Sequence, residues 1–264
     1  MNLKLLTEQV VGLSKKVGQM IRKEVDRLGT SDVEYKGVHN LVTYVDKKSE
    51  ELLIAELRKI LPEAGFIAEE DDKLAKAERY NWIVDPLDGT TNFIHKIPLY
   101  SISIALNDGD ETILGVVYEI NLQECFYAWK NGPALLNGKE IHVSETGVLD
   151  NSLIATGFPY YDYSQLDPYL ALFKDLMQSS RGVRRLGSAA VDLAYVAAGR
   201  FELFYEYGLH PWDVAAGALI VKQAGGCVTK FHGGDDFVFG KEIIASNNQV
   251  HNEFLKKLSH YFFS

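Results

Sequence analysis

The stretch "NWIVDPLDGTTNF" (residues 81–93) carries two carboxylates on a rigid turn that follows an apolar run. The apolar run, 82–84, is typical of a buried strand, and it stops at Asp85. Asp88 lies three residues further on, and Pro86 restricts the backbone between the two acids. The pattern therefore predicts two carboxylates held in fixed positions at the end of a buried strand.

Further acids favour a cation site over an ordinary turn. D-P-x-D-G alone is also turn chemistry, because Pro and Asp-Gly favour turns and Thr caps helices. Glu69, however, lies near the end of a strand-like segment (65–70), and Asp213 begins a helix directly after an aromatic residue. Carboxylate oxygens without cysteine or a histidine-rich cluster are the ligands that Mg²⁺ prefers, and the carbonyl of Leu87 could join them.

Each of these acids also has a simpler explanation when it is taken singly. The acidic run 70–72 fits a solvated surface, and Asp213 alone fits a helix N-cap. Glu69, Asp85 and Asp213 are far apart in the sequence, so their spacing alone does not establish that they converge on one ion.

Composition describes an acidic protein of ordinary hydrophobicity and excludes several classes. The 264 residues are 47% hydrophobic and 24% charged, with a net charge of -9, and they suffice for one large domain or two small ones. The densest basic cluster, 181–186, is short, so nucleic-acid binding is unlikely by charge. Cys125 and Cys227 form no CxxC pair, which fits a reducing cytoplasm. No signal peptide or apolar membrane span is expected.

The first half of the chain predicts an α+β arrangement with an antiparallel sheet. Apolar spacing predicts a helix over 3–28, which Gly29 ends. A second helix begins near Asp46, with Asp46 or Ser49 as its cap, and Pro62 closes it. The expected strands lie within 65–70 and 80–86, a hairpin at 99–120, and two short strands at 124–141.

The second half alternates strands and helices, which predicts a layered α/β unit. We expect Gly225 at the C-terminal end of one of its helices. Without a Pro/Ser-rich linker, the halves (1–145 and 146–264) are expected to pack as two lobes of one compact unit. The strands are predicted at 152–158, 182–187, 201–207 and 242–247, and the helices at 165–179, 188–200, 213–226 and the C-terminus.

Helix starts rich in small residues add a second kind of chemistry. The segments 88–93, 186–193 and 210–217 each place small or polar residues where free backbone N–H groups can bind an anion, although each alone is ordinary capping. Together with Mg²⁺-type acids they indicate metal-assisted hydrolysis of a phosphate ester. The sequence has no G-x-x-x-x-G-K-[ST] of P-loop NTPases and no G-x-S-x-G nucleophile elbow. No GxGxxG follows a strand, so a nicotinamide cofactor is unlikely.

Three motifs in order, 65–70, 82–93 and 210–226, resemble the inositol monophosphatase family within the lithium-sensitive, Mg²⁺-dependent phosphatase superfamily. The resemblance runs from about Lys36 to Asn247. It implies an α/β (α+β) fold, the layered αβαβα sandwich of the inositol monophosphatase and fructose-1,6-bisphosphatase type. It also implies a homodimer and two or three Mg²⁺ ions in each active site.

The resemblance also implies roles for individual residues. Asp85 would bridge two Mg²⁺ ions, Asp88 and Asp213 would hold the second, and Thr90 with Glu69 would position the attacking water, so that Glu69, Thr90 and Asp85 are the catalytic residues. The implied metal ligands are Glu69, Asp85, the Leu87 carbonyl, Asp88 and Asp213. The implied substrate contacts are Asp88, Gly89, Thr90, Gly187, Ser188, Ala189, Glu206 and Asp213, of which Gly89 and Thr90 cradle the phosphate.

Other residues receive weaker assignments. Lys36 would lie in a loop like the family's mobile metal-binding flap, and Asp46 could support a further ion. His210 is interpreted as a supporting or structural residue, because the reaction requires no catalytic imidazole. Trp82 and Trp212 are expected in the core.

The sequence therefore predicts a cytoplasmic, Mg²⁺-dependent phosphatase that hydrolyses myo-inositol-1-phosphate and related sugar or polyol phosphates. Sibling activities on fructose-1,6-bisphosphate, histidinol phosphate or 3′-phosphoadenosine nucleotides are the alternatives within the superfamily. A binding or regulatory module on the same scaffold, for example one that contacts RNA or transcription machinery, is the non-enzymatic alternative. The complete acid set argues against an inactive site, and the net charge of -9 argues against nucleic acid.

Overall fold

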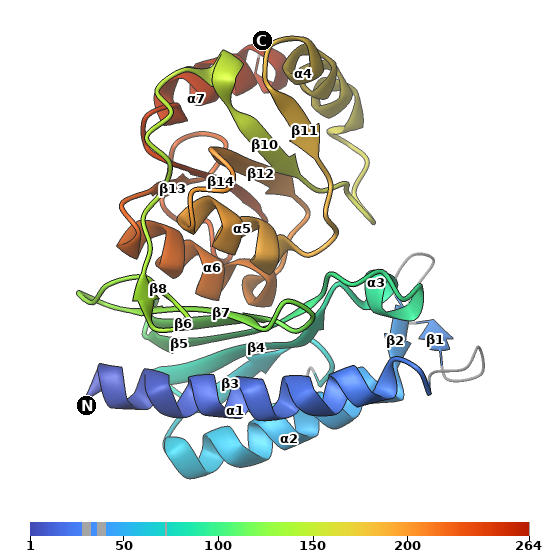
Figure 1. Cartoon of the computed structure of the whole chain (residues 1–264), viewed down its shortest axis with the longest axis vertical. Helices are drawn as coiled ribbons and strands as arrows, with labels where there is room; N and C mark the ends of the chain where they lie inside the picture. The colour runs from blue at the N-terminus through green and yellow to red at the C-terminus, as the bar shows by residue number, and fades with distance from the viewer. Residues whose placement is uncertain (28–32, 36–40, 72, 264) are drawn as a thin grey trace.

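A computed structural model describes residues 1–27, 33–35, 41–71 and 73–263. Within these residues the chain forms five layers, which Figure 1 shows stacked from bottom to top as helices, sheet, helices, sheet and helices. This arrangement confirms the predicted αβαβα sandwich. Lys36 and Gly29 lie outside the described residues, so the predictions made for them are not addressed.

Two long helices, α1 (Leu3–Glu24) and α2 (Tyr44–Ile60), form the first layer (Figure 1). α1 ends earlier than the predicted residue 28, and residues 25–27 form a turn. α2 is capped by Thr43, not by Asp46 or Ser49. Asp46 is the third helical residue and completes a capping box, because its carboxylate accepts the backbone N–H of Thr43 at 2.9 Å.

The second layer is a seven-stranded sheet in the order β3-β4-β5-β6-β7-β8-β9. β3 and β4 are parallel, which corrects the prediction of a wholly antiparallel sheet, whereas the remaining neighbours are antiparallel. The apolar faces of α1 and α2 pack on one side of this sheet around the buried Trp82. The strands are β3 (Gly65–Ala68), β4 (Tyr80–Asp88), β5 (Ser101–Asp108), β6 (Glu111–Glu119), β7 (Glu124–Trp129), β8 (Leu135–Leu136) and β9 (Lys139–Glu140).

Helices α5 (Ala189–Ala197) and α6 (Pro211–Gln223) fill the middle layer between the two sheets. Their small residues permit close packing: a Cβ at Gly115 of β6 would approach the carbonyl oxygen of Ala216 to 2.6 Å. A Cβ at Gly217 would lie 2.5 Å from Leu193, so α5 and α6 also pack closely against each other. α6 is followed by Gly225 in the left-handed region (φ 89°), as predicted.

The fourth layer is a five-stranded sheet in the order β11-β10-β12-β14-β13. β10 pairs in parallel with β11 and β12, and β14 runs antiparallel to β12 and β13. The short strand β13 was not predicted. These strands are β10 (Leu153–Thr156), β11 (Gly182–Arg184), β12 (Leu203–Tyr207), β13 (Cys227–Thr229) and β14 (Glu242–Ser246).

Helices α4 (Leu166–Gln178) and α7 (His251–Phe262) cover the outer face of the second sheet and complete the fifth layer (Figure 1). Smaller elements complete the described chain: strands β1 (Val33–Tyr35) and β2 (Leu41–Thr43), the short helix α3 (Thr90–Ile94) and a 3₁₀ turn, η2 (Leu149–Asn151). The chain leaves the first sheet after Glu140 and enters the second at Leu153, and the exact lobe boundary at residue 145 stays a prediction. Among the described helices, none is long and apolar enough to span a membrane.

Candidate metal and phosphate site

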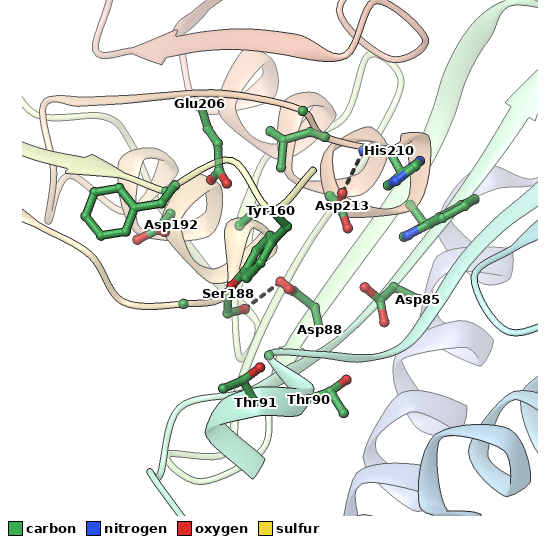
Figure 2. A pocket seen from close by; sticks show the side chains of 18 of the residues that line it. Asp85, Asp88, Thr90, Thr91, Tyr160, Ser188, Asp192, Glu206, His210 and Asp213 are labelled. Atoms are coloured by element: carbon green, nitrogen blue, oxygen red, sulfur yellow. Dashed lines mark hydrogen bonds between the residues drawn. The ribbon is translucent and has the colours of Figure 1, made fainter. Parts of the chain in front are cut away.

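A cavity of about 310 Å³ lies where the end of β4 meets the N-termini of α3, α5 and α6 (Figure 2). The structure brings together the eleven predicted metal ligands and substrate contacts, although they come from five separate regions of the chain, whereas Asp46 lies outside the cavity lining and Lys36 outside the described residues. The predicted residues that line this cavity are Glu69, Asp85, Leu87, Asp88, Gly89, Thr90, Gly187, Ser188, Ala189, Glu206 and Asp213.

Asp85 is a buried carboxylate at an irregularity in the pairing between β4 and β5. It is 2% exposed and is opposite Ser103, and the register of the two strands shifts between Asp85 and Asp88, where Pro86 interrupts the ladder. Its Oδ1 accepts the backbone N–H of Leu87 at 2.8 Å. The Asp-Pro turn therefore holds this side chain in one orientation, as the sequence predicted.

Three carboxylates converge at the floor of the cavity. Oxygen atoms of Asp85, Asp88 and Asp213 all lie within 4.8 Å of one another. Burial, followed by the charges of Glu69, Asp88 and Asp213, raises the pKa of Asp85 well above its ordinary value. Such repulsion is relieved by a divalent cation, and an all-oxygen donor set suits Mg²⁺. Glu69 lines the same cavity, but its carboxylate is not part of this close group.

The start of α5 fixes Asp88. Its Oδ2 accepts the Ser188 hydroxyl at 2.6 Å, drawn as a dashed line in Figure 2, and the backbone N–H of Ala190 at 2.8 Å. Ser188 is also the N-cap of α5, with its side chain facing the N–H of Val191. A helix start from the middle layer thus orients a carboxylate from the first sheet.

Asp213 is fixed by the first turn of its own helix. Its Oδ2 accepts the backbone N–H of His210 at 2.7 Å, so Asp213 is the third residue of a capping box and not the N-cap (Figure 2). The His210 ring stacks on Trp212, with centroids 4.7 Å apart and planes 9° apart. Trp212 lines the cavity and is only half-buried, which corrects its prediction as a core residue.

Thr90 joins the turn to the first helix layer. Its Oγ1 lies 2.9 Å from Oδ1 of Asp46 and 3.0 Å from the carbonyl oxygen of Leu87, so its one proton serves either acceptor. Asp46 is 1% exposed, and its other oxygen accepts both the N–H and the hydroxyl of Thr43. Burial raises the pKa of Asp46. In this arrangement Asp46 orients Thr90, and the prediction of a further ion there stays a prediction.

The phosphate side of the cavity is built from backbone. Gly89, at the N-cap of α3, has a φ of 99°, and a Cβ there would lie 3.1 Å from the carbonyl oxygen of Gly187. A side chain at position 89 would therefore be strained and crowded. The first N–H groups of α3 have no carbonyl acceptor within the helix, and such groups bind anions.

The side of the cavity opposite the turn contains buried acids. Glu206 at the end of β12 is 7% exposed, and burial raises its pKa to about 8. Asp192 of α5 is 1% exposed and lies beside it in Figure 2. Asp192 was not among the predicted site residues, although an acid within the apolar helix 189–197 was an available signal. Arg185 and Tyr160 also line the cavity and were not identified.

The acidic run after β3 is only partly solvated. Glu70 is half-buried, and its backbone N–H donates to Glu50 Oε2 at 2.9 Å, whereas Asp71 is exposed as expected. Asp72, the last acid of the run, lies outside the described residues.

The family model for the inositol monophosphatase family matches residues 2–261. Among curated proteins, the chain is 40% identical over 241 residues to a Nus factor SuhB of Pseudomonas aeruginosa, covering 89% of each chain. It is 37% identical over 252 residues to an inositol-1-monophosphatase of Mesorhizobium japonicum, covering 95% of each. Among solved structures, the Thermotoga maritima IMPase superposes with a TM-score of 0.87 at 36% identity, covering 96% of each chain.

Proposed function

The chain belongs to the inositol monophosphatase family of phosphatases, and on this premise we propose that it is a Mg²⁺-dependent hydrolase of myo-inositol-1-phosphate and related polyol phosphates. The products are the free alcohol and inorganic phosphate. The observation that carries the proposal is the convergence of Asp85, Asp88 and Asp213 within 4.8 Å beside the helix start at Gly89.

The donor set fits the metal chemistry of such a reaction. Mg²⁺, when bound, neutralises the phosphate dianion, lowers the pKa of water and stabilises the leaving alkoxide. In the proposal Asp85 would contribute to both ions, Asp88 and Asp213 would hold one of them, and Glu69 and the Leu87 carbonyl would complete the other. Two or three ions is the number that we propose for each site.

The side chains of the turn also prepare the attack on phosphorus. The Thr90 hydroxyl donates a hydrogen bond to Asp46 or to the Leu87 carbonyl. The lone pairs of its oxygen therefore remain able to accept a hydrogen bond from the attacking water. Glu69 is the acid placed to share that water. The N–H groups after Gly89 orient the phosphate, and this fixed polar environment lowers the barrier without a covalent enzyme intermediate.

The opposite wall of the cavity is proposed to hold the alcohol. Gly187, Ser188 and Ala189 provide a backbone surface at the start of α5, and the Glu206 carboxylate accepts hydrogen bonds from ring hydroxyls. The phosphate end is common to all monoesters, so this wall decides between inositol and other alcohols. Inhibition by Li⁺, a cytoplasmic location and a homodimer are further parts of the proposal, and they rest on the family.

Two alternatives to inositol-1-phosphate hydrolysis remain, a sibling substrate and a regulatory role. A sibling substrate, such as fructose-1,6-bisphosphate, histidinol phosphate or a 3′-phosphoadenosine nucleotide, would use the same acids with a different alcohol wall. A regulatory role is favoured by the name Nus factor, which relatives of about 40% identity carry. The complete set of acids in the cavity supports hydrolysis alongside any such role.

Phosphate release from purified protein tests the proposal. We expect Mg²⁺-dependent hydrolysis of inositol-1-phosphate, abolished by EDTA, with a higher kcat/KM than for the three sibling substrates. Faster hydrolysis of a sibling would reassign the substrate. No release from any ester in Mg²⁺ would leave the regulatory alternative.

A further inference from the structure

The alcohol wall contains two buried carboxylates from different layers, and only one of them has a role so far. Asp192 lies in the first turn of α5 and Glu206 at the end of β12, and both line the cavity. In the view of Figure 2 both carboxylates lie to the left of Asp85, Asp88 and Asp213. The two are near enough to interact, because the charge of Glu206, after burial, raises the pKa of Asp192.

The carboxylate of Asp192 has no hydrogen-bond partner among the described residues. Its Oδ1 is fully buried and unpaired, and the residue is 1% exposed. Buried polar atoms in proteins are almost always paired, and an unpaired carboxyl costs stability. A helix of this composition would be more stable with an apolar residue there, so the acid needs a partner that the protein itself does not provide.

Glu206 is held in a similar state. Among the described residues, burial and the charges of Arg185 and Asp88 act on its carboxylate and no hydrogen bond does, and a Cβ at Gly157 would collide with it. The absence of a side chain at Gly157 therefore lets the carboxylate occupy this position against the backbone. Two acids, both lacking donors, consequently face one cavity.

The missing partners are hydrogen-bond donors and not a further cation. Arg185 already acts on this pair, because its charge lowers the pKa of both Asp192 and Glu206. Its guanidinium lies 5.8 Å from the ring centroids of Phe158 and Tyr160, so aromatic side chains hold it at the cavity mouth. With one positive charge in place, neutral hydroxyl groups can donate to both carboxyls without adding charge.

We propose that Asp192 is a second substrate-recognition residue, which together with Glu206 selects phosphate esters whose alcohol carries hydroxyl groups on at least two carbons. This inference rests on the proposed function and specifies the alcohol that the site accepts. The two carboxyls accept hydrogen bonds from hydroxyl groups of the alcohol, so an alcohol of the same ring shape without hydroxyls leaves both carboxyls unpaired. Discrimination against such an alcohol is the property that Asp192 contributes.

Asp192→Asn tests this with two esters that differ only in their hydroxyls. Inositol-1-phosphate carries ring hydroxyls, and cyclohexyl phosphate has the same ring without them. Asn keeps the size of Asp but replaces one acceptor oxygen by an amide donor, which cannot accept a hydrogen bond from a hydroxyl. We expect kcat/KM for inositol-1-phosphate to fall by about tenfold or more, and that for cyclohexyl phosphate to change less than about twofold.

Asp167→Asn is the matched control, because Asp167 is the acid in the first turn of α4, far from the cavity lining. It reports the effect of losing a carboxylate at a helix start, and we expect it to leave both rates unchanged. Thermal unfolding separates recognition from a structural role, since removing an unpaired buried acid should not lower the melting temperature. A lower melting temperature with equal losses on both esters would show that Asp192 is structural and would overturn the inference.

The wild-type rates separate this inference from the proposed function. If neither ester releases phosphate in Mg²⁺, the proposed function fails, and the inference fails with it. If both are hydrolysed and Asp192→Asn leaves their ratio unchanged, only the inference fails. Phosphoethanolamine, a small ester with an ammonium group, completes the panel, because its hydrolysis faster than that of inositol-1-phosphate would assign the two carboxylates to a cation and refute hydroxyl recognition.

Discussion

Replacing Asp85 by Asn should stabilise the metal-free protein and abolish its activity. The amide keeps an oxygen that can accept the Leu87 N–H, now bonded at 2.8 Å, so the turn has no reason to change shape. The charge is lost from the centre of the acid group. In the metal-free state that charge is unfavourable, whereas in the presence of Mg²⁺ it is proposed to bind the ions.

The magnitude follows from the spacing of the acids. Two ionised carboxylates whose oxygens lie within 4.8 Å of each other repel by about 3.5 kcal/mol or more at an effective dielectric constant near 20. The carboxyl escapes this repulsion by taking up a proton, which limits the cost at pH 7 to about 4 kcal/mol for a group of ordinary pKa 3.8. Asp85→Asn removes this cost, but burying an amide offsets part of the gain, so we expect the substitution to stabilise the metal-free protein by about 1–3 kcal/mol.

The sign also predicts a pH dependence. The pKa of Asp85 is raised in the folded protein, so the folded state binds more protons than the unfolded state above the ordinary pKa of 3.8. The stability of the metal-free wild type therefore falls as pH rises from this value toward the folded pKa. The curve for Asp85→Asn should be flatter over the same range.

Thermal unfolding in EDTA and in Mg²⁺, with phosphate release on the same samples, measures both effects. In EDTA the variant should melt about 2–5 °C above wild type, and Mg²⁺ should raise the melting temperature of wild type only. Turnover should fall on the order of a thousandfold or more. Asp110→Asn, in an exposed turn between β5 and β6, is the control and should behave as wild type. An Asp85→Asn variant that melts lower in EDTA, or that still responds to Mg²⁺, would refute the reasoning.

The remaining predictions concern the alcohol wall, the ion site and a buried imidazole. Glu206→Gln should lower kcat/KM for inositol-1-phosphate by about tenfold while changing that for cyclohexyl phosphate, which has no ring hydroxyls, much less, and equal losses would make Glu206 structural. Li⁺ should inhibit initial rates by competing for the site of Asp88 and Asp213, and equal inhibition by K⁺ would reduce this to ionic strength. His251 is buried beside Ser246, and burial lowers its pKa, so its contribution to stability is complete above the ordinary value of 6.5 and is lost as pH falls below it. Unfolding midpoints of His251→Asn should therefore vary less than wild type between pH 7.5 and 5.5, and parallel curves would contradict this.

Most of the fold could be predicted because hydrophobic period and turn residues agree along the chain. Most strands and helices of both halves appear close to their predicted positions, although the segment 124–141 forms three strands, β7, β8 and β9, where two were predicted. The errors have local causes. β13 (Cys227–Thr229) is too short to show a period, and the parallel pairing of β3 with β4 depends on tertiary contacts that no local pattern records. Thr43 caps α2 because Asp46, expected as the cap, instead completes the capping box.

The site was predictable where a motif marked it and not where only folding creates the contact. The acids of 82–93 could be predicted because they lie in a recognisable turn motif. Thr90 and Asp46, in contrast, are 44 residues apart, and nothing in either segment predicts their hydrogen bond. Asp192 was missed for a different reason. An acid in the first turn of a helix is ordinary there, and only the structure shows that its carboxylate has no partner and faces a cavity.

The ion site and the docking of the middle layer depend on each other. Asp88 belongs to the first sheet but is oriented by Ser188 of the α5 start, and the hydroxyl of Ser103 in β5 donates to the Trp212 carbonyl of α6 at 2.9 Å. The three acids come close together only when α5 and α6 pack against that sheet, because Asp213 lies in α6. Their repulsion then opposes this packing until a cation binds. Cation binding should therefore strengthen the interface between the first sheet and the helices α5 and α6. The contacts that assemble the ion site thus also make the stability of the fold depend on whether a cation is bound.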